Sequence, residues 1–181
     1  MVTIIFEPHA TTLDNETRLA SGWNDVQLSK LGIQQARDMG KRYALTDLDA
    51  IFTSDLERAY ETARLAFPEL EPRKLHVDWR LRECDYGNLT QHSKEEIDNE
   101  KPQRIHTPFP NGESYEQTTK RMKSFLEDLL HFHDDEIILI IGHRATQYGL
   151  EHLVKNVPLH TTIAAPWKWQ PGWTYVLTEK V

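Results

Sequence analysis

The chain has 181 residues, of which 39% are hydrophobic and 27% are charged, and this composition is typical of a folded globular protein. Its formal net charge of −7 argues against general nucleic-acid binding, because phosphate backbones select basic surfaces. No apolar run approaches the roughly 20 residues that a membrane helix needs, and we expect no signal peptide. Because Cys84 is the single cysteine, no internal disulfide can form, and we expect a reducing, cytoplasmic location. The length predicts one domain over residues 1–181.

Two strands and two helices are predicted in the first third of the chain. Short apolar runs at residues 4–6 and 48–52 predict buried strands, the first of them ending at a proline that cannot donate a ladder hydrogen bond. Residues 11–24 lack a clear period and are predicted to form a loop. Apolar side chains at helical spacing predict helices over residues 30–43 and 56–67.

The middle of the chain alternates between irregular and helical segments. A short strand is predicted at residues 75–77, and a loop without either period at 81–90. A short helix is predicted to begin at residue 94, before a second loop at 102–112 that is rich in proline and contains Asn-Gly. A long amphipathic helix follows, with its apolar face spanning residues 122–130.

Three serines stand where helices are predicted to begin. Ser29, Ser93 and Ser114 are suitable N-caps, because a serine hydroxyl accepts hydrogen bonds from the first backbone amides. Glu96 and Gln117 lie three residues after the second and third serines and fit the capping-box pattern.

Residues 137–141 give the strongest strand signal, because five branched apolar residues in succession are typical of a strand buried on both faces. A helix is predicted over 148–154, and a last strand over 174–178. Strands that alternate with helices predict an α/β fold: a three-layer α/β/α sandwich around a mostly parallel central sheet.

Chemically active residues follow three of these strands. His9 comes just after the first strand, His143 just after residues 137–141, and Arg58 lies in the first turns of the helix after residues 48–52. If the three strands are parallel neighbours, their carboxyl ends share one edge of the sheet, where α/β proteins bind ligands. Two histidines, an arginine and helix N-termini suit a phosphoryl group, and Glu83 in a nearby loop could donate a proton.

The sequence resembles the histidine phosphatase superfamily, the phosphoglycerate-mutase-like enzymes. Matching blocks occur in the family's order and cover most of the chain: Pro8-His9-Ala10, Asn15, Ser21-Gly22-Trp23-Asn24-Asp25, Thr53-Ser54-Asp55-Leu56-Glu57-Arg58-Ala59, Leu81-Arg82-Glu83 with Tyr86-Gly87, Asn111-Gly112-Glu113-Ser114, and Gly142-His143. Each block alone is weak, but together they are specific. The resemblance implies the fold predicted above.

The resemblance also implies the roles of four residues. His9 attacks phosphorus and becomes phosphohistidine, Glu83 protonates the leaving oxygen and then activates water, and Arg58 and His143 hold the phosphoryl oxygens. Further residues are expected to contact the substrate: Asn15, Arg18, Ser21, Gly22, Tyr86 and Arg144. No cofactor and no metal is implied, and the neighbouring His131 and His133 are interpreted as structural or solvated.

The chain departs from the family pattern at the first strand. Pro8 replaces the family's first arginine, Ala10 replaces a glycine, and Arg144 follows the second histidine where a small residue is usual. One hypothesis is that Arg144 enters the phosphoryl pocket in place of the missing guanidinium, with Glu7 as its partner. The alternative is a solvated Arg144 and a pocket with one cation fewer.

The reading that we favour is a phosphatase acting on a small phosphorylated metabolite. A mutase is less favoured, because the stretch from Glu83 to His143 is too short for the mutase insertion that shields the site from water. Two alternatives are also considered. One is a non-catalytic protein that binds a phosphorylated ligand, and the other is a site for another anion such as a sulfate ester. We expect the loops at residues 11–24, 83–109 and 161–173 to determine substrate specificity. The tryptophans at 167, 169 and 173 either line a substrate pocket or pack in the core.

Overall fold

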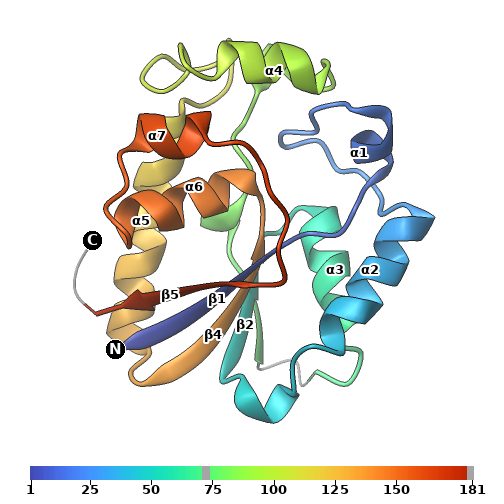
Figure 1. Cartoon of the computed structure of the whole chain (residues 1–181), viewed down its shortest axis with the longest axis vertical. Helices are drawn as coiled ribbons and strands as arrows, with labels where there is room; N and C mark the ends of the chain where they lie inside the picture. Colours follow the sequence, from blue (N-terminus) through green and yellow to red (C-terminus); the bar gives the residue numbers. More distant parts are fainter. Residues whose placement is uncertain (71–73, 179–181) are drawn as a thin grey trace.

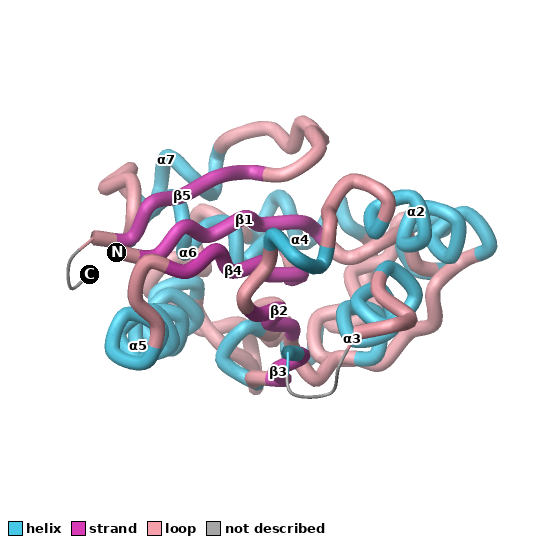
Figure 2. Tube along the Cα trace, turned by 90° about the horizontal axis from the view of Figure 1, so that it is seen from below, coloured by secondary structure: helices cyan, strands magenta, loops and turns pink. Residues whose placement is uncertain are grey.

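The computed structural model describes residues 1–70 and 74–178, in which a five-stranded sheet lies between two layers of helices (Figures 1 and 2). The strands are β1 (Val2–Pro8), β2 (Ala50–Thr53), β3 (Leu75–Val77), β4 (Glu136–Gly142) and β5 (Trp173–Leu177). The helices are α1 (Leu13–Thr17), α2 (Lys30–Gly40), α3 (Glu57–Ala66), α4 (Lys94–Glu100), α5 (Tyr115–Phe132), α6 (Arg144–Leu153) and α7 (Leu159–Ala164). The predicted α/β sandwich is confirmed.

The strand order β3-β2-β4-β1-β5 makes the predicted neighbours adjacent. β4 lies between β1 and β2 and is parallel to both, while β5 is antiparallel to β1 at one edge. In this register Pro8 pairs with Gly142, and Thr53 pairs with Ile141. The carboxyl ends of β1, β2 and β4 therefore lie level with one another at the same edge of the sheet.

Each face of the sheet buries a separate hydrophobic cluster. On one face α5 and α6 contribute Met122, Phe125, Leu126, Leu129 and Leu150, and on the other α2 and α3 contribute Met39, Ala63 and Ala66. Figure 1 shows these two helix pairs on opposite sides of the strands. Within the described residues no helix combines the length and apolar composition that crossing a bilayer requires.

All three predicted N-caps are confirmed. Ser29 accepts a hydrogen bond from Gly32 N at 3.1 Å, Ser93 accepts one from Glu96 N at 3.1 Å, and Ser114 forms a complete capping box with Gln117. The box joins Gln117 N to Ser114 Oγ at 3.1 Å and Ser114 N to Gln117 Oε1 at 2.8 Å.

Several predicted boundaries were wrong. The segment 11–24, expected to be a loop, contains the single-turn α1, which Thr12 and Asn15 cap reciprocally. The loop at 81–90 includes a 3₁₀ turn at Gly87–Leu89, and α7 was not predicted. α6 begins at Arg144, four residues earlier than the pattern suggested, because its first turn is polar and faces the site described below.

Candidate active site

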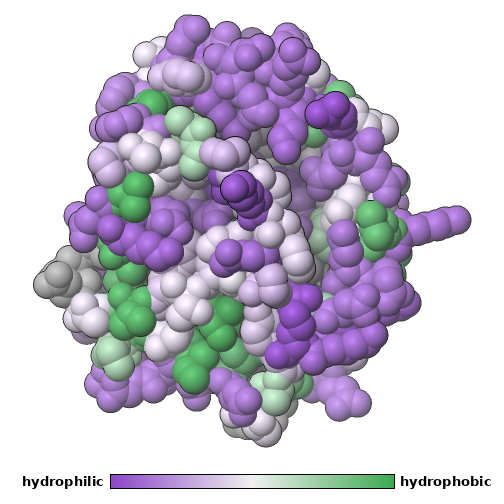
Figure 3. Space-filling model, viewed as in Figure 1, coloured by the Kyte–Doolittle hydropathy of each residue, from purple (hydrophilic) through white to green (hydrophobic). Residues whose placement is uncertain are grey.

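A cavity of about 1430 Å³ opens at the carboxyl ends of β1, β2 and β4. Figure 3 shows the surface hollowed below α4, between α1 and the chain that follows α7. Typical small-molecule sites enclose roughly 300–1,000 Å³, so this cavity is large. All ten site residues predicted from the sequence line it: His9, Asn15, Arg18, Ser21, Gly22, Arg58, Glu83, Tyr86, His143 and Arg144.

His9 presents one reactive nitrogen to this cavity. Its Nδ1 lies 2.8 Å from the carbonyl oxygen of Ala10, and since a carbonyl only accepts hydrogen bonds, Nδ1 carries the proton. Nε2 therefore keeps its lone pair. Burial, and secondarily the positive charge of Arg58, lowers the pKa of His9 to about 3, so the imidazole is neutral near pH 7.

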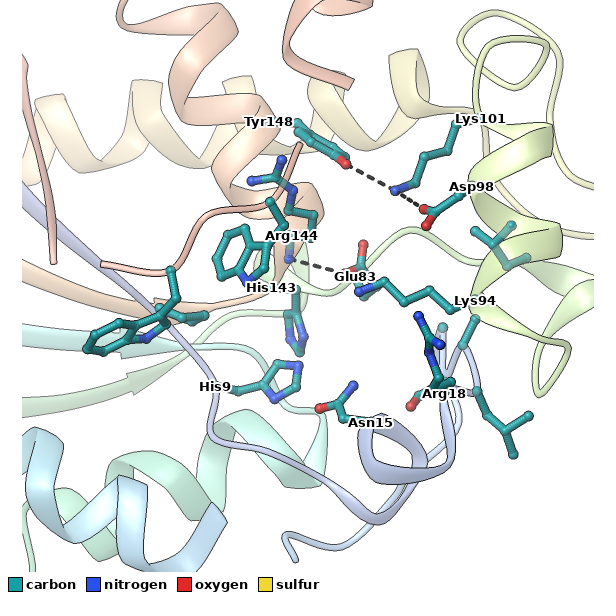
Figure 4. A pocket seen from close by; sticks show the side chains of 18 of the residues that line it. His9, Asn15, Arg18, Glu83, Lys94, Asp98, Lys101, His143, Arg144 and Tyr148 are labelled. Carbon is teal, nitrogen blue, oxygen red and sulfur yellow. Dashed lines mark hydrogen bonds and ion pairs between the residues drawn. The ribbon is translucent and has the colours of Figure 1, made fainter. Parts of the chain in front are cut away.

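His143 lies beside His9, with the ring centroids 5.1 Å apart (Figure 4). Its Nε2 is 2.7 Å from Ser54 Oγ, and its backbone N–H donates to Thr146 Oγ1 at 3.0 Å. Burial above all, and then Arg58, lowers the pKa of His143 well below its usual value. Its buried Nδ1 has no hydrogen-bond partner among the described residues, and a ligand oxygen would satisfy it.

Arg58 brings a buried positive charge to the same place. Its side chain is 2% exposed and is held by carbonyl oxygens, with Nη2 2.7 Å from Gly22 O and Nη1 3.1 Å from Asn24 O. None of the carboxylates in the described part of the chain forms an ion pair with it. Burial lowers the pKa of the guanidinium from its usual value, but an arginine stays protonated. A buried guanidinium without a direct ion pair suits an anion.

Glu83 lies at the N-terminus of α6, where the backbone amides point at its carboxylate. Oε1 accepts from Cys84 N at 2.8 Å and from Ala145 N at 3.2 Å, and Oε2 accepts from Arg144 N at 3.2 Å. The side chain is 8% exposed. These bonds hold the carboxyl group at the cavity wall, close to the two histidines (Figure 4).

Arg121 is a supporting residue that sequence reasoning missed. From the middle of α5 it donates to the carbonyl oxygens of Arg80, Arg82 and Glu83 at 2.6, 2.8 and 2.8 Å, and it pairs with Glu113. These bonds hold the loop that carries Glu83. The sequence did contain a signal for this role. Arg121 lies directly before Met122 on the apolar face of the helix, and a charged residue there needs buried partners.

Several expected substrate contacts also have structural partners. Ser21 Oγ donates to Asp14 Oδ2 at 2.8 Å, and Asn15 Oδ1 accepts from Thr12 N at 3.1 Å in the α1 capping box. Tyr86 packs edge-on against Phe109 and is 8% exposed. These side chains line the cavity and stabilise its walls at the same time.

The structure corrects the hypothesis about Arg144. Its guanidinium lies over Tyr148 and Trp167, at 4.7 Å from each ring, and donates to Gln147 Oε1 and to Ala165 O. Figure 4 shows this side chain directed toward Tyr148 rather than toward His9. It therefore does not occupy the position beside His9 that the hypothesis gave it.

The expected pairing of Glu7 with Arg144 was also wrong. Glu7 is fully buried and bonds Arg42 Nη2 at 2.8 Å and the Tyr43 hydroxyl at 2.5 Å. The strand alternation places the side chain of Glu7 on the face covered by α2, and the segment just after α2 supplies both partners.

Cations also gather at the outer part of the cavity. Arg18 extends from the end of α1, and Lys94 and Lys101 extend from α4 (Figure 4). Lys101 pairs with Asp98 at 2.6 Å and contacts the Tyr148 hydroxyl at 3.2 Å. The two lysines were not predicted, since the charged pattern of α4 resembles any solvated helix.

The described residues contain no cluster of three or more histidine, cysteine or acidic side chains that could hold a metal ion. His133 contacts Glu136 instead, at 2.5 Å.

Comparisons with known proteins agree with a phosphoryl-binding arrangement of this site. A family model described as histidine phosphatase superfamily, branch 1, matches residues 4–170. A candidate phosphoserine phosphatase of Hydrogenobacter thermophilus is 31% identical over 159 residues, which cover 83% of this chain and 77% of that protein. The solved structure of Bacillus stearothermophilus YhfR is 26% identical and superposes with a TM-score of 0.85, covering 99% of this chain and 93% of YhfR.

A 2,3-bisphosphoglycerate-dependent phosphoglycerate mutase of Streptococcus agalactiae is 41% identical over 100 residues. That match covers 53% of this chain but only 44% of the mutase, so the similarity spans less than half of the longer protein.

Proposed function

Because this chain belongs to the histidine phosphatase superfamily, we propose that it hydrolyses a phosphomonoester through a phosphohistidine on His9. The observation that carries the proposal is the neutral imidazole of His9, with its Nε2 lone pair available at the cavity, beside the buried charge of Arg58. Splitting the hydrolysis into two displacements at phosphorus replaces one difficult step by two easier ones.

In the first step, Nε2 of His9 donates its lone pair to phosphorus while the bond to the ester oxygen breaks. A protonated Glu83 gives its proton to the departing oxygen, which leaves as an alcohol. The charge on the phosphoryl oxygens is stabilised by the guanidinium of Arg58 and by the unpartnered nitrogen of His143.

In the second step, the Glu83 carboxylate takes a proton from water, whose oxygen attacks phosphorus as the bond to nitrogen breaks. His9 recovers its lone pair, and phosphate leaves. Residues 84–135 are occupied by α4, α5 and their connections, and the cavity is open to solvent, which favours transfer to water over retention and return to a substrate. We therefore prefer a phosphatase to a mutase, with a small phosphorylated metabolite as substrate, and the buried thiol of Cys84 fits a reducing, cytoplasmic location.

The test is phosphate release from p-nitrophenyl phosphate in the presence of EDTA, with the wild type beside His9→Ala. We expect turnover that survives the chelator and that falls by at least about a thousandfold in the variant, because the nucleophile acts in both steps. Turnover that is unaffected by His9→Ala would refute the mechanism. Acid quenching during turnover should also trap phosphate on the wild-type protein.

A binding protein is the second candidate, and the replacement of the family's first arginine by Pro8 is the observation that favours it. A guanidinium makes charge-assisted bonds to phosphoryl oxygens, so its absence weakens transition-state binding. If the wild type binds vanadate but releases no phosphate, Pro8→Arg should create activity. If Pro8→Arg leaves turnover absent and vanadate affinity unchanged, the missing arginine is not the cause.

A further inference from the structure

One wall of the cavity is aromatic and comes from the chain between α7 and β5. Trp167 and Trp169 line the cavity there and are 40% and 61% exposed, and Tyr148 of α6 lines the same side. Indole rings bury large areas when they bind a partner, so two exposed indoles at the mouth of a cavity indicate a contact surface for a ligand.

Arg144 and the core hold this wall in place. The guanidinium of Arg144 lies between the rings of Tyr148 and Trp167, 4.7 Å from each, and donates to the carbonyl oxygen of Ala165 at 3.0 Å. Trp167 is 5.4 Å from Trp173 of β5, and Trp173 packs on Phe6 of β1 at 5.8 Å. The wall is therefore connected through ring contacts to the strand that ends at the nucleophile, and Trp167 is positioned before any ligand binds.

The indole of Trp169, unlike that of Trp167, makes no ring contact with another side chain of the described residues. Within residues 1–70 and 74–178 no ring pair, cation–π contact or hydrogen bond engages its indole, although it lines the same cavity as His9 and Glu83. An indole in that position offers a flat apolar face to a bound molecule.

We propose that this wall, defined as Tyr148, Trp167 and Trp169, is a leaving-group subsite that selects phosphomonoesters carrying a planar aromatic ring, which stacks on Trp169. The inference rests on the proposed phosphatase function and adds the chemical class of the substrate. A cavity of about 1430 Å³ leaves room for a ring beyond the reacting phosphoryl group. The ring could belong to an arylmethyl ester or to a nucleoside monophosphate, since both present the same flat π-face.

The test compares esters that share the type of reacting bond and differ in whether they carry an aromatic ring. Benzyl phosphate is paired with cyclohexylmethyl phosphate, which has a puckered ring of the same size, and adenosine 5′-monophosphate is paired with ribose 5-phosphate. We expect kcat/KM to be about tenfold higher for the aromatic member, as stacking on one indole allows. The first pair responds if the source is an arylmethyl ester, and the second if it is a nucleotide.

Trp169→Ala should lower the aromatic-to-saturated ratio of kcat/KM toward one in the responding pair. Arg144→Met should lower the same ratio, because Trp167 and the Ala165 carbonyl lose the guanidinium that holds them. The substitution keeps the backbone amide of residue 144 that donates to Glu83. Trp79→Ala is the matched control, since Trp79 is 52% exposed and lies outside the cavity, and its ratio should equal that of the wild type. Thermal unfolding of each variant establishes that the proteins compared are folded.

Equal kcat/KM within both pairs for the wild type would overturn the subsite, as would a ratio that Trp169→Ala does not change. Absence of phosphate release from all four esters would instead count against the phosphatase proposal. The subsite is then decided by calorimetric binding of benzylphosphonate against cyclohexylmethylphosphonate, which needs no turnover. About tenfold tighter binding of the aromatic phosphonate, lost in Trp169→Ala, would support the subsite, and equal binding would refute it.

Discussion

Two neighbours set the state of the His9 imidazole: the Ala10 carbonyl fixes its tautomer, and the Arg58 guanidinium adds to the effect of burial in lowering its pKa. We predict that the imidazole stays neutral from pH 8 to pH 5, since its pKa is lowered to about 3. An NMR titration of ring-labelled histidine checks this directly. A resonance of His9 that titrates near pH 6.5, the ordinary value for histidine, would contradict the assignment of a neutral imidazole with a lowered pKa.

The same shift links stability to pH. The unfolded chain protonates His9 near pH 6.5, whereas the folded protein does so near pH 3, so between these values the unfolded state binds more protons. The stabilisation is complete above pH 6.5 and is lost as the pH falls toward 3. Between pH 7.5 and 5 we expect the wild type to lose more free energy of unfolding than His9→Asn, which has no imidazole to protonate. The difference should be on the order of 1 kcal/mol, because His9 is only partly buried and solvent screens part of the effect. Urea unfolding at both pH values measures the difference.

Arg144 shows how a single residue can be placed correctly and given the wrong partner. The sequence indicated that it follows the second histidine and borders the site, and it does line the cavity. Its side chain turns away from the phosphoryl end because Tyr148 and Trp167 offer two ring faces and Ala165 offers a carbonyl. A guanidinium is satisfied by stacking and hydrogen bonds as well as by an anion.

At the scale of elements, Arg121 of α5 holds the loop at residues 81–90 that carries Glu83, which we call the acid loop. We predict that Arg121→Met lowers stability by about 3 kcal/mol, because it leaves the carbonyl oxygens of Arg80 and Arg82 without a side-chain donor and removes the ion pair with Glu113. It should also lower kcat with little change in KM, since Glu83 is displaced while Arg58 and His143 are not. Urea unfolding and steady-state kinetics below the transition temperature provide both quantities.

Arg104→Met is the control for that variant. Arg104 is 18% exposed and also pairs with a carboxylate, Glu100, and with a carbonyl, Pro108, but it does not contact the acid loop. Its removal should cost some stability and leave kcat unchanged. An equal fall in kcat for Arg104→Met and Arg121→Met would show that the effect is one of general stability.

The predicted elements were most accurate where local chemistry decides the conformation. The serine caps of α2, α4 and α5 and the buried strand β4 follow from hydroxyl acceptors and from unbroken apolar runs. α1 and α7 escaped prediction because each has six residues or fewer, so neither completes the apolar period by which a helix is identified.

At the scale of the whole molecule, the helix layer on one face of the sheet depends on a close contact between α2 and α3. A Cβ added at Gly40 of α2 would lie 1.9 Å from the carbonyl oxygen of Ala66 of α3, so Gly40→Ala must separate the two helices or distort their ends. We predict a loss of at least about 2 kcal/mol in the free energy of unfolding, measured with urea. The general preference of helices for alanine over glycine acts in the opposite direction, so a loss reports the close contact.

Gly149→Ala in α6 is the matched substitution. There the added Cβ would lie 2.7 Å from Met122 Cγ, the middle of a flexible side chain that can move. We expect a smaller loss than for Gly40→Ala. Equal losses would mean that the α2–α3 contact has no special rigidity.

The sequence by itself determined the fold class, the family and ten of the residues that line the cavity, because caps, apolar periods and motif spacing are local properties that one chain displays in order. Only the tertiary structure decided which atoms meet. The pairing of Glu7 with Arg42, the support of the acid loop by Arg121 and the stacking of Arg144 on Trp167 join residues that lie at least 23 positions apart. Such contacts are set by the strand order and by the competition of each side chain for partners, neither of which a local pattern records.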